Sequence, residues 1–149
     1  MNKAKIGVIG AGWWATEFHI PHLQKRDDVE LVSVCKLEQD QLDFVKNKFG
    51  FEYASTDFKK MLDFSPLDGV VIASPHFAHF ENAKASLQKG CHVLIEKPMT
   101  TNSQDAEELY GLAKEVKKEI LVPNGFNFTH YMPKACLLYT SPSPRDPIG

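Results

Sequence analysis

The chain has 149 residues, of which 43% are hydrophobic, and its formal net charge at pH 7 is −2. This length allows one globular domain with a packed core but not two full domains. The balanced charge gives no basic field for nucleic acid, no apolar run reaches the roughly 20 residues of a membrane span, and the N-terminus lacks a signal-peptide pattern. The composition therefore predicts a soluble, cytoplasmic protein and excludes nucleic-acid-binding and membrane-spanning classes.

Residues 5–15 read K-I-G-V-I-G-A-G-W-W-A and organise the rest of the chain. The β-branched run predicts a buried parallel strand, and Gly10, Gly12 and Ala15 follow it at G-x-G-x-x-A spacing. Gly10 would permit a tight turn, Gly12 would let the backbone approach a pyrophosphate, and Ala15 would let a helix pack on the strand. Phosphates would then lie on N–H groups at a helix N-terminus. The alternative is a glycine-rich turn without a ligand.

Helices and strands are expected to alternate along the rest of the chain. Helices are predicted at residues 14–24, where Pro21 would cause a kink or an early end, at 39–49, from a Ser55 or Thr56 cap to about 64, at 78–89 and, after cap residues 101–103, to about 118. Gly50 and Gly90 are expected to end the second and fourth of these helices. Strands are predicted at residues 30–35, 51–53, 68–73, 91–95 and 120–122. This alternation predicts an α/β fold with a doubly wound parallel sheet.

The three cysteines are Cys35, Cys91 and Cys136, an odd number without C-x-x-C spacing. Neither a disulfide framework nor a structural zinc site follows from this pattern. We expect them to be small buried residues in or beside strands.

Two histidine pairs, His19 with His22 and His76 with His79, have a spacing that could place two metal ligands on one helical face. Neither pair has a third ligand nearby in the sequence, so no metal site is predicted. His92, within an apolar strand, is expected to be a hydrogen-bonded structural histidine.

The last fourteen residues, 136–149, depart from this pattern. Residues 136–146 read C-L-L-Y-T-S-P-S-P-R-D, which matches one reading frame of a transposase sequencing adapter. We therefore expect the authentic protein to continue only to about Ala135 and residues 136–149 to be an adapter-derived, disordered tail. The alternative is a genuine Pro/Ser-rich tail. On the first interpretation the chain is the front part of a longer protein.

Three motifs together resemble those of the Gfo/Idh/MocA oxidoreductases, the group of glucose–fructose oxidoreductase and inositol dehydrogenase. They are the glycine pattern, A-S-P-H-x-x-H at residues 73–79, and G-C-H-V-L-I-E-K-P at residues 90–98. The resemblance extends over residues 3–127 and implies a nicotinamide-dependent dehydrogenase or reductase. It divides the chain into an NAD(P)-binding Rossmann domain at residues 1–123, the start of a truncated substrate domain at 124–135, and the tail.

The resemblance also implies roles for particular residues. The pyrophosphate turn would contain Gly10, Ala11, Gly12, Trp13 and Trp14, and Ser74, Pro75 and His79 would lie beside the cofactor. Glu96 and Lys97 would lie at its nicotinamide end, where the lysine contacts the nicotinamide ribose and often the substrate hydroxyl. The Lys97 ammonium, the candidate catalytic group, could polarise a carbonyl that accepts hydride or assist proton removal from an alcohol. Pro98 is expected to follow a cis peptide bond.

Two departures from the family pattern matter. NAD-preferring relatives have an Asp or Glu at the end of the second strand, whereas this chain has Lys36, and a cation there would favour the 2′-phosphate of NADP. The alternative is that Lys36 points to solvent and Glu38 binds the ribose. The family's acid–base histidine and aspartate belong to the substrate domain, so this chain is expected to lack turnover alone.

The complete protein is expected to act on a small sugar- or polyol-like substrate and to form a homo-oligomer. Trp13 and Trp14 are expected to cover the cofactor or to pack against the neighbouring domain. Alternative functions are a non-catalytic NAD(P) sensor and an interaction protein whose dinucleotide site is vacant.

Overall fold

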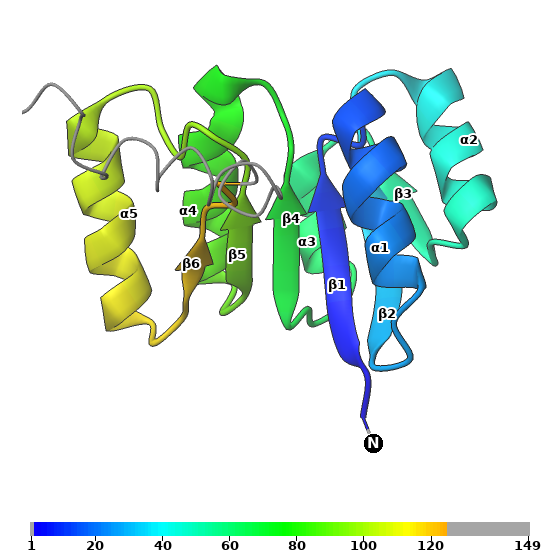
Figure 1. The fold of residues 1–149 in the computed structure, drawn as a ribbon, viewed down its shortest axis with the longest axis horizontal. Coiled ribbons are helices and arrows are strands. Elements are labelled where there is room, and N and C mark those ends of the chain that lie inside the picture. The colour runs from blue at the N-terminus through cyan, green and yellow to red at the C-terminus, as the bar shows by residue number, and fades with distance from the viewer. Residues whose placement is uncertain (1, 125–149) are drawn as a thin grey trace, which may run out of the picture.

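Six strands lie parallel in one sheet with the order β3-β2-β1-β4-β5-β6 (Figure 1). The structure is a computed structural model that describes residues 2–124. The strands are β1 (Ala4–Ile9), β2 (Val29–Cys35), β3 (Tyr53–Ser55), β4 (Gly69–Ile72), β5 (His92–Ile95) and β6 (Ile120–Leu121). This order is that of the doubly wound dinucleotide-binding fold, so the predicted fold class is confirmed.

Helices connect successive strands and cover both faces of the sheet. They are the π-helical turn η1 (Ala15–His19), α1 (Ile20–Gln24), α2 (Gln39–Phe49), α3 (Phe58–Asp63), the 3-10 turn η2 (His76–Ala78), α4 (His79–Gln88) and α5 (Ser103–Glu115). None of these helices is both long and apolar enough to cross a bilayer. The bounds of α2, α4 and α5 confirm the expected helices at 39–49, 78–89 and after residue 102 to within a few residues.

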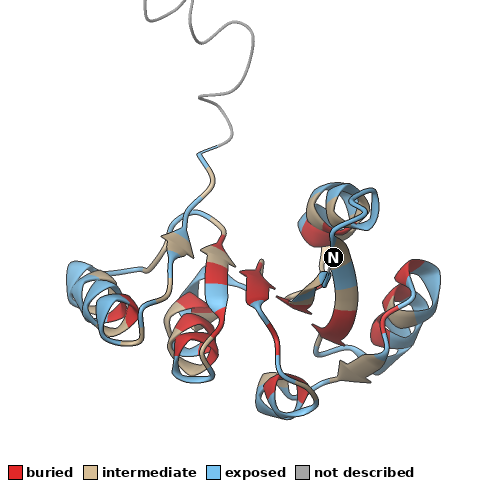
Figure 2. Cartoon of the chain, turned by 90° about the horizontal axis from the view of Figure 1, so that it is seen from below, coloured by how far each residue is buried: buried red, intermediate tan, exposed pale blue. Residues whose placement is uncertain are grey.

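The core forms two clusters, one on each face of the sheet, because alternate residues of a strand point to opposite faces. Val8 and Val71 pack with the helices α1 and α2, whereas Ile9 and Ile72 pack with α3, α4 and α5. All four residues of β4 are buried, as expected for a parallel strand covered on both faces. Figure 2 shows the buried residues on the strands and on the helix sides that face them.

Two predicted boundaries near the third strand were wrong. The strand starts at Tyr53 rather than at Phe51, because Phe51 comes just after Gly50, the cap of α2, and is buried in the core beside that helix. The cap of α3 is Asp57, whose carboxylate accepts a hydrogen bond from the Lys59 N–H at 2.9 Å. Ser55 instead accepts one from the Asp57 N–H at 3.0 Å, so the predicted cap residue supports the actual one.

The helical segment does not end early at Pro21. The helical segment widens into the π-turn η1, in which the Ile20 N–H donates to the Ala15 carbonyl, and Pro21 then occupies the first turn of α1. Pro21 has no N–H to donate to the ladder, and it closely follows the π-turn, where the regular ladder of the α-helix is already interrupted. The predicted extent of the helix was right, and the early end that was the alternative effect of Pro21 does not occur.

Cys35 and Cys91 are free thiols and are buried, which confirms that prediction for these two. Cys136, the expected start of the substrate domain and the expected tail lie outside the described residues. His92, the first residue of β5, is exposed, and its Nδ1 accepts a hydrogen bond from the Glu119 N–H at 3.1 Å, which confirms the predicted hydrogen-bonded histidine.

Candidate cofactor site at the carboxyl edge of the sheet

Three of the predicted site segments meet where β1, β4 and β5 end. These strands are neighbours, and Gly10, Ser74 and Glu96 each lie at or just beyond the carboxyl end of one of them. Backbone hydrogen bonds fix the three ends together: the Ala73 N–H donates to the Ile9 carbonyl at 2.8 Å, and the Glu96 N–H donates to the Ile72 carbonyl at 2.9 Å. Ligands of open α/β sheets bind at this edge.

Gly10 and Gly12 differ in what a side chain would meet. Gly10 has φ +86°, and a Cβ built there would lie 2.5 Å from the Ala73 carbonyl carbon, so only glycine fits. At Gly12 a Cβ would meet nothing within 4 Å. Packing within the described residues therefore requires Gly10 but gives no reason for Gly12, whereas close approach of a ligand does.

The backbone beyond Gly12 offers hydrogen-bond donors. The Thr16 N–H donates to the Gly12 carbonyl at 3.0 Å and starts the helical ladder, so the N–H groups of residues 13–15 precede that ladder. The helix dipole adds partial positive charge at the same place. This cradle suits a pyrophosphate, which makes the residues fit a dinucleotide.

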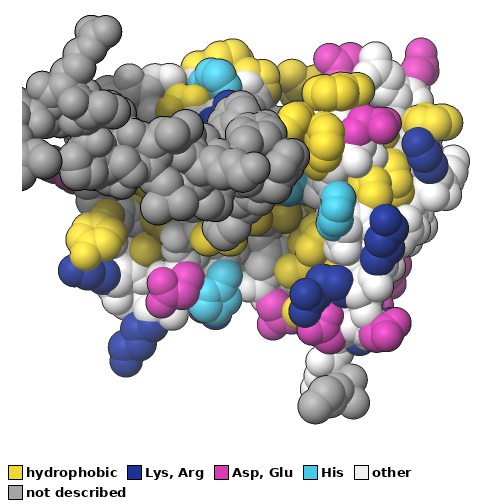
Figure 3. Space-filling view, in the orientation of Figure 1, with side chains coloured by type: hydrophobic (Ala, Val, Ile, Leu, Met, Phe, Trp, Pro, Cys, Tyr) yellow, Lys and Arg dark blue, Asp and Glu magenta, His cyan; other side chains and the backbone are white. Residues whose placement is uncertain are grey.

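Trp13, Trp14 and Phe18 form an exposed aromatic cluster beside this cradle. The ring centroids of Trp14 and Phe18 are 4.2 Å apart, and Trp13 lies edge-on to Phe18 at 5.7 Å. Trp13 keeps 69% of its surface exposed. Hydrophobic side chains are visible in Figure 3 over the helical segment that follows β1.

Glu96 is held by two side chains from that segment. The Trp14 indole N–H donates to Oε1 of Glu96 at 2.8 Å, and Nε2 of His19 lies 2.7 Å from the same oxygen. Burial by itself raises the pKa of Glu96, but the hydrogen bonds from Trp14 and His19 outweigh it and hold the pKa below its usual range. Glu96 is therefore an ionised carboxylate at neutral pH.

Lys97 and Pro98 follow at the surface. The Lys97 side chain is exposed, and its ammonium forms no ion pair with any residue between 2 and 124. The Lys97–Pro98 peptide bond is cis, as the resemblance implied. Lys97 itself follows β5 by two residues, at the edge where the three strands end.

His79 lies beneath this edge rather than on it. Its side chain is fully buried, Nδ1 lies 2.8 Å from the Pro98 carbonyl, and Nε2 lies 2.8 Å from the Ser74 carbonyl. Both ring nitrogens are thus engaged by the backbone, so His79 joins the loop after β4 to the loop after β5 and offers no ring atom to a ligand. Ser74 is also held by Asn82, whose amide donates to its hydroxyl at 2.8 Å, while Pro75 is exposed.

Lys36 lies just after β2 and is paired with Glu38. The Lys36 ammonium is 3.0 Å from Oε2 of Glu38, and only 14% of the Lys36 side chain is exposed. The hydrogen bond from Lys36 lowers the pKa of Glu38. Lys36 is therefore not directed freely to solvent as the alternative supposed, although Glu38 lies close enough to it for either residue to contact a ribose there.

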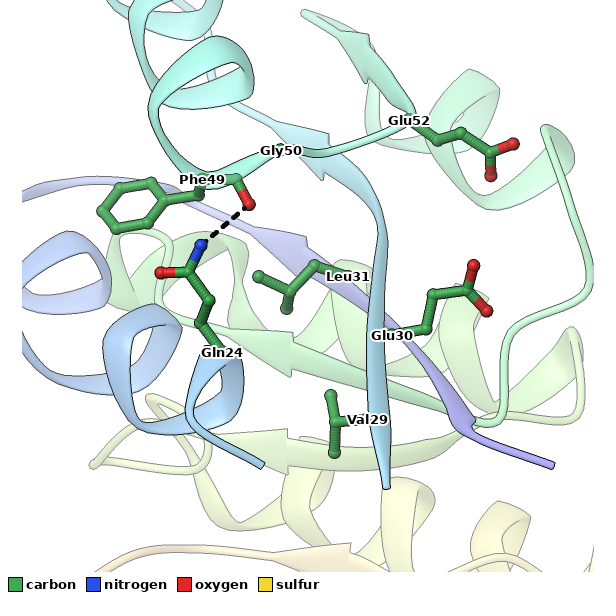
Figure 4. A pocket seen from close by; sticks show the side chains of 7 residues that line it. All are labelled: Gln24, Val29, Glu30, Leu31, Phe49, Gly50 and Glu52. Carbon is green, nitrogen blue, oxygen red and sulfur yellow. Dashed lines mark hydrogen bonds between the residues drawn. The ribbon is translucent and has the colours of Figure 1, made fainter. Parts of the chain in front are cut away.

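A surface pocket elsewhere does not compete with this site. It lies between the end of α1, the start of β2 and the end of α2, where the Gln24 amide donates to the Phe49 carbonyl at 3.3 Å (Figure 4). Its walls carry the carboxylates of Glu30 and Glu52 and no cation, so a phosphate would be repelled.

His19 is the site residue that the sequence did not reveal. Its spacing from His22 suggested a metal pair, yet its partner Glu96 is 77 residues away. Within residues 2–124 no group of three His, Cys, Asp or Glu side chains could hold a metal ion. No local pattern could have indicated the Glu96 contact.

Comparison with known proteins agrees with this geometry. Residues 4–124 match the GFO_IDH_MocA model, described as "Oxidoreductase family, NAD-binding Rossmann fold". The chain is 31% identical over 129 residues to D-glucoside 3-dehydrogenase of Escherichia coli (strain K12), covering 87% of this chain and 36% of that protein. It is 31% identical over 123 residues to myo-inositol 2-dehydrogenase of Thermotoga maritima, covering 83% of this chain and 36% of that protein.

A solved structure gives the same fold. A mutant 3-ketoreductase from Actinomadura kijaniata, in complex with TDP-benzene and NADP, superposes with a TM-score of 0.81 at 27% identity. The match covers 93% of this chain and 42% of that protein. The chain thus spans well under half the length of the relatives that it matches.

Proposed function

Because the chain belongs to the Gfo/Idh/MocA oxidoreductase family, whose matching model describes an NAD-binding Rossmann fold, we propose that it is the dinucleotide-binding part of an NAD(P)-dependent oxidoreductase. The observation that carries the proposal is the position of Gly12: the space beside it is open, and it directly precedes the N–H groups at the start of the helical ladder, where a pyrophosphate would bind. A bound nicotinamide would supply the hydride acceptor or donor. No observation favours the sensor or the vacant-site alternative.

Different residues along the carboxyl edge would contact different parts of the cofactor. The backbone of residues 10–14 would bind the pyrophosphate, and Ser74 and Pro75 would line the cofactor on the β4 side. Lys97, exposed and unpaired among the described residues, would contact the nicotinamide ribose and the reacting oxygen of the substrate. We propose a positioning role for His79 in place of the expected cofactor contact, because its ring nitrogens are engaged by backbone carbonyls.

The substrate class rests on the relatives. Their names include a glucoside dehydrogenase and an inositol dehydrogenase, which supports a hydroxyl or carbonyl carbon of a sugar- or polyol-like substrate. The expected acid–base histidine and aspartate belong to the substrate domain, so we expect the 149-residue chain to bind cofactor without turnover. Homo-oligomerisation of the complete protein and a cytoplasmic location stay predictions.

We favour NADP over NAD because of Lys36. Its ammonium lies beyond β2, where the adenosine ribose of a bound dinucleotide is expected, and would attract a 2′-phosphate. Glu38, at 3.0 Å from that ammonium, is the group that would oppose this preference.

The direct test compares two glycines by isothermal titration with NADPH and NADH. A Cβ meets nothing within 4 Å at Gly12 or at Gly111, which lies in α5 far along the chain, so alanine is accommodated at both. Gly12→Ala is expected to weaken dinucleotide binding by about 10-fold or more, because the added methyl occupies the phosphate approach. Gly111→Ala should bind like the parent chain. A folded parent chain that binds neither dinucleotide would overturn the proposal.

A further inference from the structure

The Glu96 carboxylate joins two segments that are far apart in the sequence. Trp14 is 82 residues away and His19 is 77 residues away, and both contact Oε1. The other oxygen, Oε2, lies 3.3 Å from the Lys97 N–H, which donates to it. We call Trp14, His19 and Glu96 the carboxylate clamp.

The π-helical turn makes this clamp possible. In an α-helix two residues five apart point about 140° away from each other around the axis, since each residue advances it by ~100°. In η1 the Ile20 N–H donates to the Ala15 carbonyl, a bond that spans five residues, so one turn contains about one residue more. Trp14 and His19, which are five apart, can therefore reach the same oxygen.

The clamp also restricts the backbone that carries Lys97. The Glu96 N–H is bonded to the Ile72 carbonyl of β4, its side chain is bonded to the segment after the glycine turn, and the Pro98 carbonyl contacts the buried His79. The backbone on both sides of Lys97 is thus anchored, while its ammonium is paired with no acidic side chain in the described part of the chain. Side chains that fix a reacting group in this way reduce the cost of orienting it.

We infer that His19 and Trp14 are positioning residues that act through Glu96 to fix the backbone at Lys97 relative to the segment that follows the glycine turn. The inference rests on the proposed function, because Lys97 is proposed to contact the cofactor. It adds a coupling between the two ends of the dinucleotide site, in which the segment that binds the pyrophosphate also sets the place of the lysine at the nicotinamide end.

The test is a double-mutant cycle on dinucleotide affinity, measured with the dinucleotide that the parent chain binds more tightly. His19→Leu removes the donor to Glu96 and is expected to weaken binding by about 5- to 10-fold. His19→Gln retains an N–H donor near the position of Nε2 and is expected to restore most of the affinity. His22→Leu is the matched control on the same helical segment, because His22 contacts the Phe18 carbonyl and not Glu96.

The decisive measurement repeats His19→Leu in a Lys97→Met background. If His19 acts through Lys97, its loss is expected to weaken binding there by less than about 2-fold, because the coupling has been removed. The Trp14 indole N–H resonance should shift in His19→Leu and not in His22→Leu, whether or not the chain binds a dinucleotide. Equal losses in both backgrounds would overturn the inference and leave the proposed function intact. Failure of the folded parent chain to bind either dinucleotide would overturn both.

Discussion

Gly10 and Ser74 lie so close together that any side chain on Gly10 would collide with the backbone around Ser74. The two residues follow adjacent parallel strands, β1 and β4, so the turn that leaves β1 is packed directly against the loop that leaves β4. The glycine turn therefore contributes to folding independently of any ligand.

Gly10→Ala is expected to destabilise the protein by about 3 kcal/mol, because a left-handed φ and a backbone collision act together. Urea unfolding followed by circular dichroism measures this loss. Gly111→Ala, where neither problem exists, should be neutral or slightly stabilising. A Gly10→Ala variant as stable as the parent would contradict the described packing.

Lys36→Asp is expected to reverse the cofactor preference. A carboxylate in place of the ammonium repels a 2′-phosphate and can accept hydrogen bonds from the ribose hydroxyls, so the NADPH-to-NADH affinity ratio should fall by about 10-fold or more. Titration of both dinucleotides measures the ratio. Lys3→Asp, at the opposite edge of the sheet, serves as the control, and an unchanged ratio in Lys36→Asp would assign the ribose end to Glu38 instead.

The lowered pKa of Glu96 predicts a dependence of stability on pH. A carboxyl group whose pKa is lower in the folded state stabilises the protein above its unfolded pKa, about 4.3, and loses that contribution as the pH falls through its folded pKa. Glu96→Gln should therefore be less stable than the parent at pH 6, with a difference that narrows below about pH 4.3. Denaturant unfolding at several pH values measures it, with the exposed Glu107→Gln as control. A stability difference between Glu96→Gln and the parent that widens in acid would contradict a pKa of Glu96 that is lowered by folding.

Cys35 and Cys91 are expected to resist alkylation in the folded protein. Burial, and to a smaller extent the nearby Asp57 carboxylate, raises the pKa of Cys35 to about 11. Burial also raises the pKa of Cys91. Because the thiolate is the reactive form, iodoacetamide at pH 8 should label both only after unfolding in urea. Peptide mass spectrometry distinguishes them from Cys136, and rapid labelling of Cys35 in the native protein would contradict its burial.

Much of the fold follows from local sequence patterns. The apolar runs of β1, β2 and β4 and the helix ended by Gly50 could be predicted because each has its own periodicity and end signal. The third strand could not be placed correctly, because Phe51 looks like a strand residue and is used instead as a core residue beside α2. Tertiary packing decided that boundary.

The candidate site was predictable to the extent that motifs mark it. Gly10 and Gly12 could be proposed from their spacing after a strand, and Glu96 and Lys97 from the motif that carries the family resemblance. The buried position of His79 and the contact of His19 with Glu96 depend on which loops the sheet brings together, and no local spacing contains that information.

The π-turn between Ala15 and Ile20 makes the length of this segment as important as its composition. Deleting one residue there would restore the ordinary helical ladder. It would also turn the residues before the deletion by about 100° around the helix axis relative to the residues after it. Trp14 and His19 could then no longer meet at one oxygen. Among relatives, substitutions in this segment should therefore be far more common than insertions or deletions.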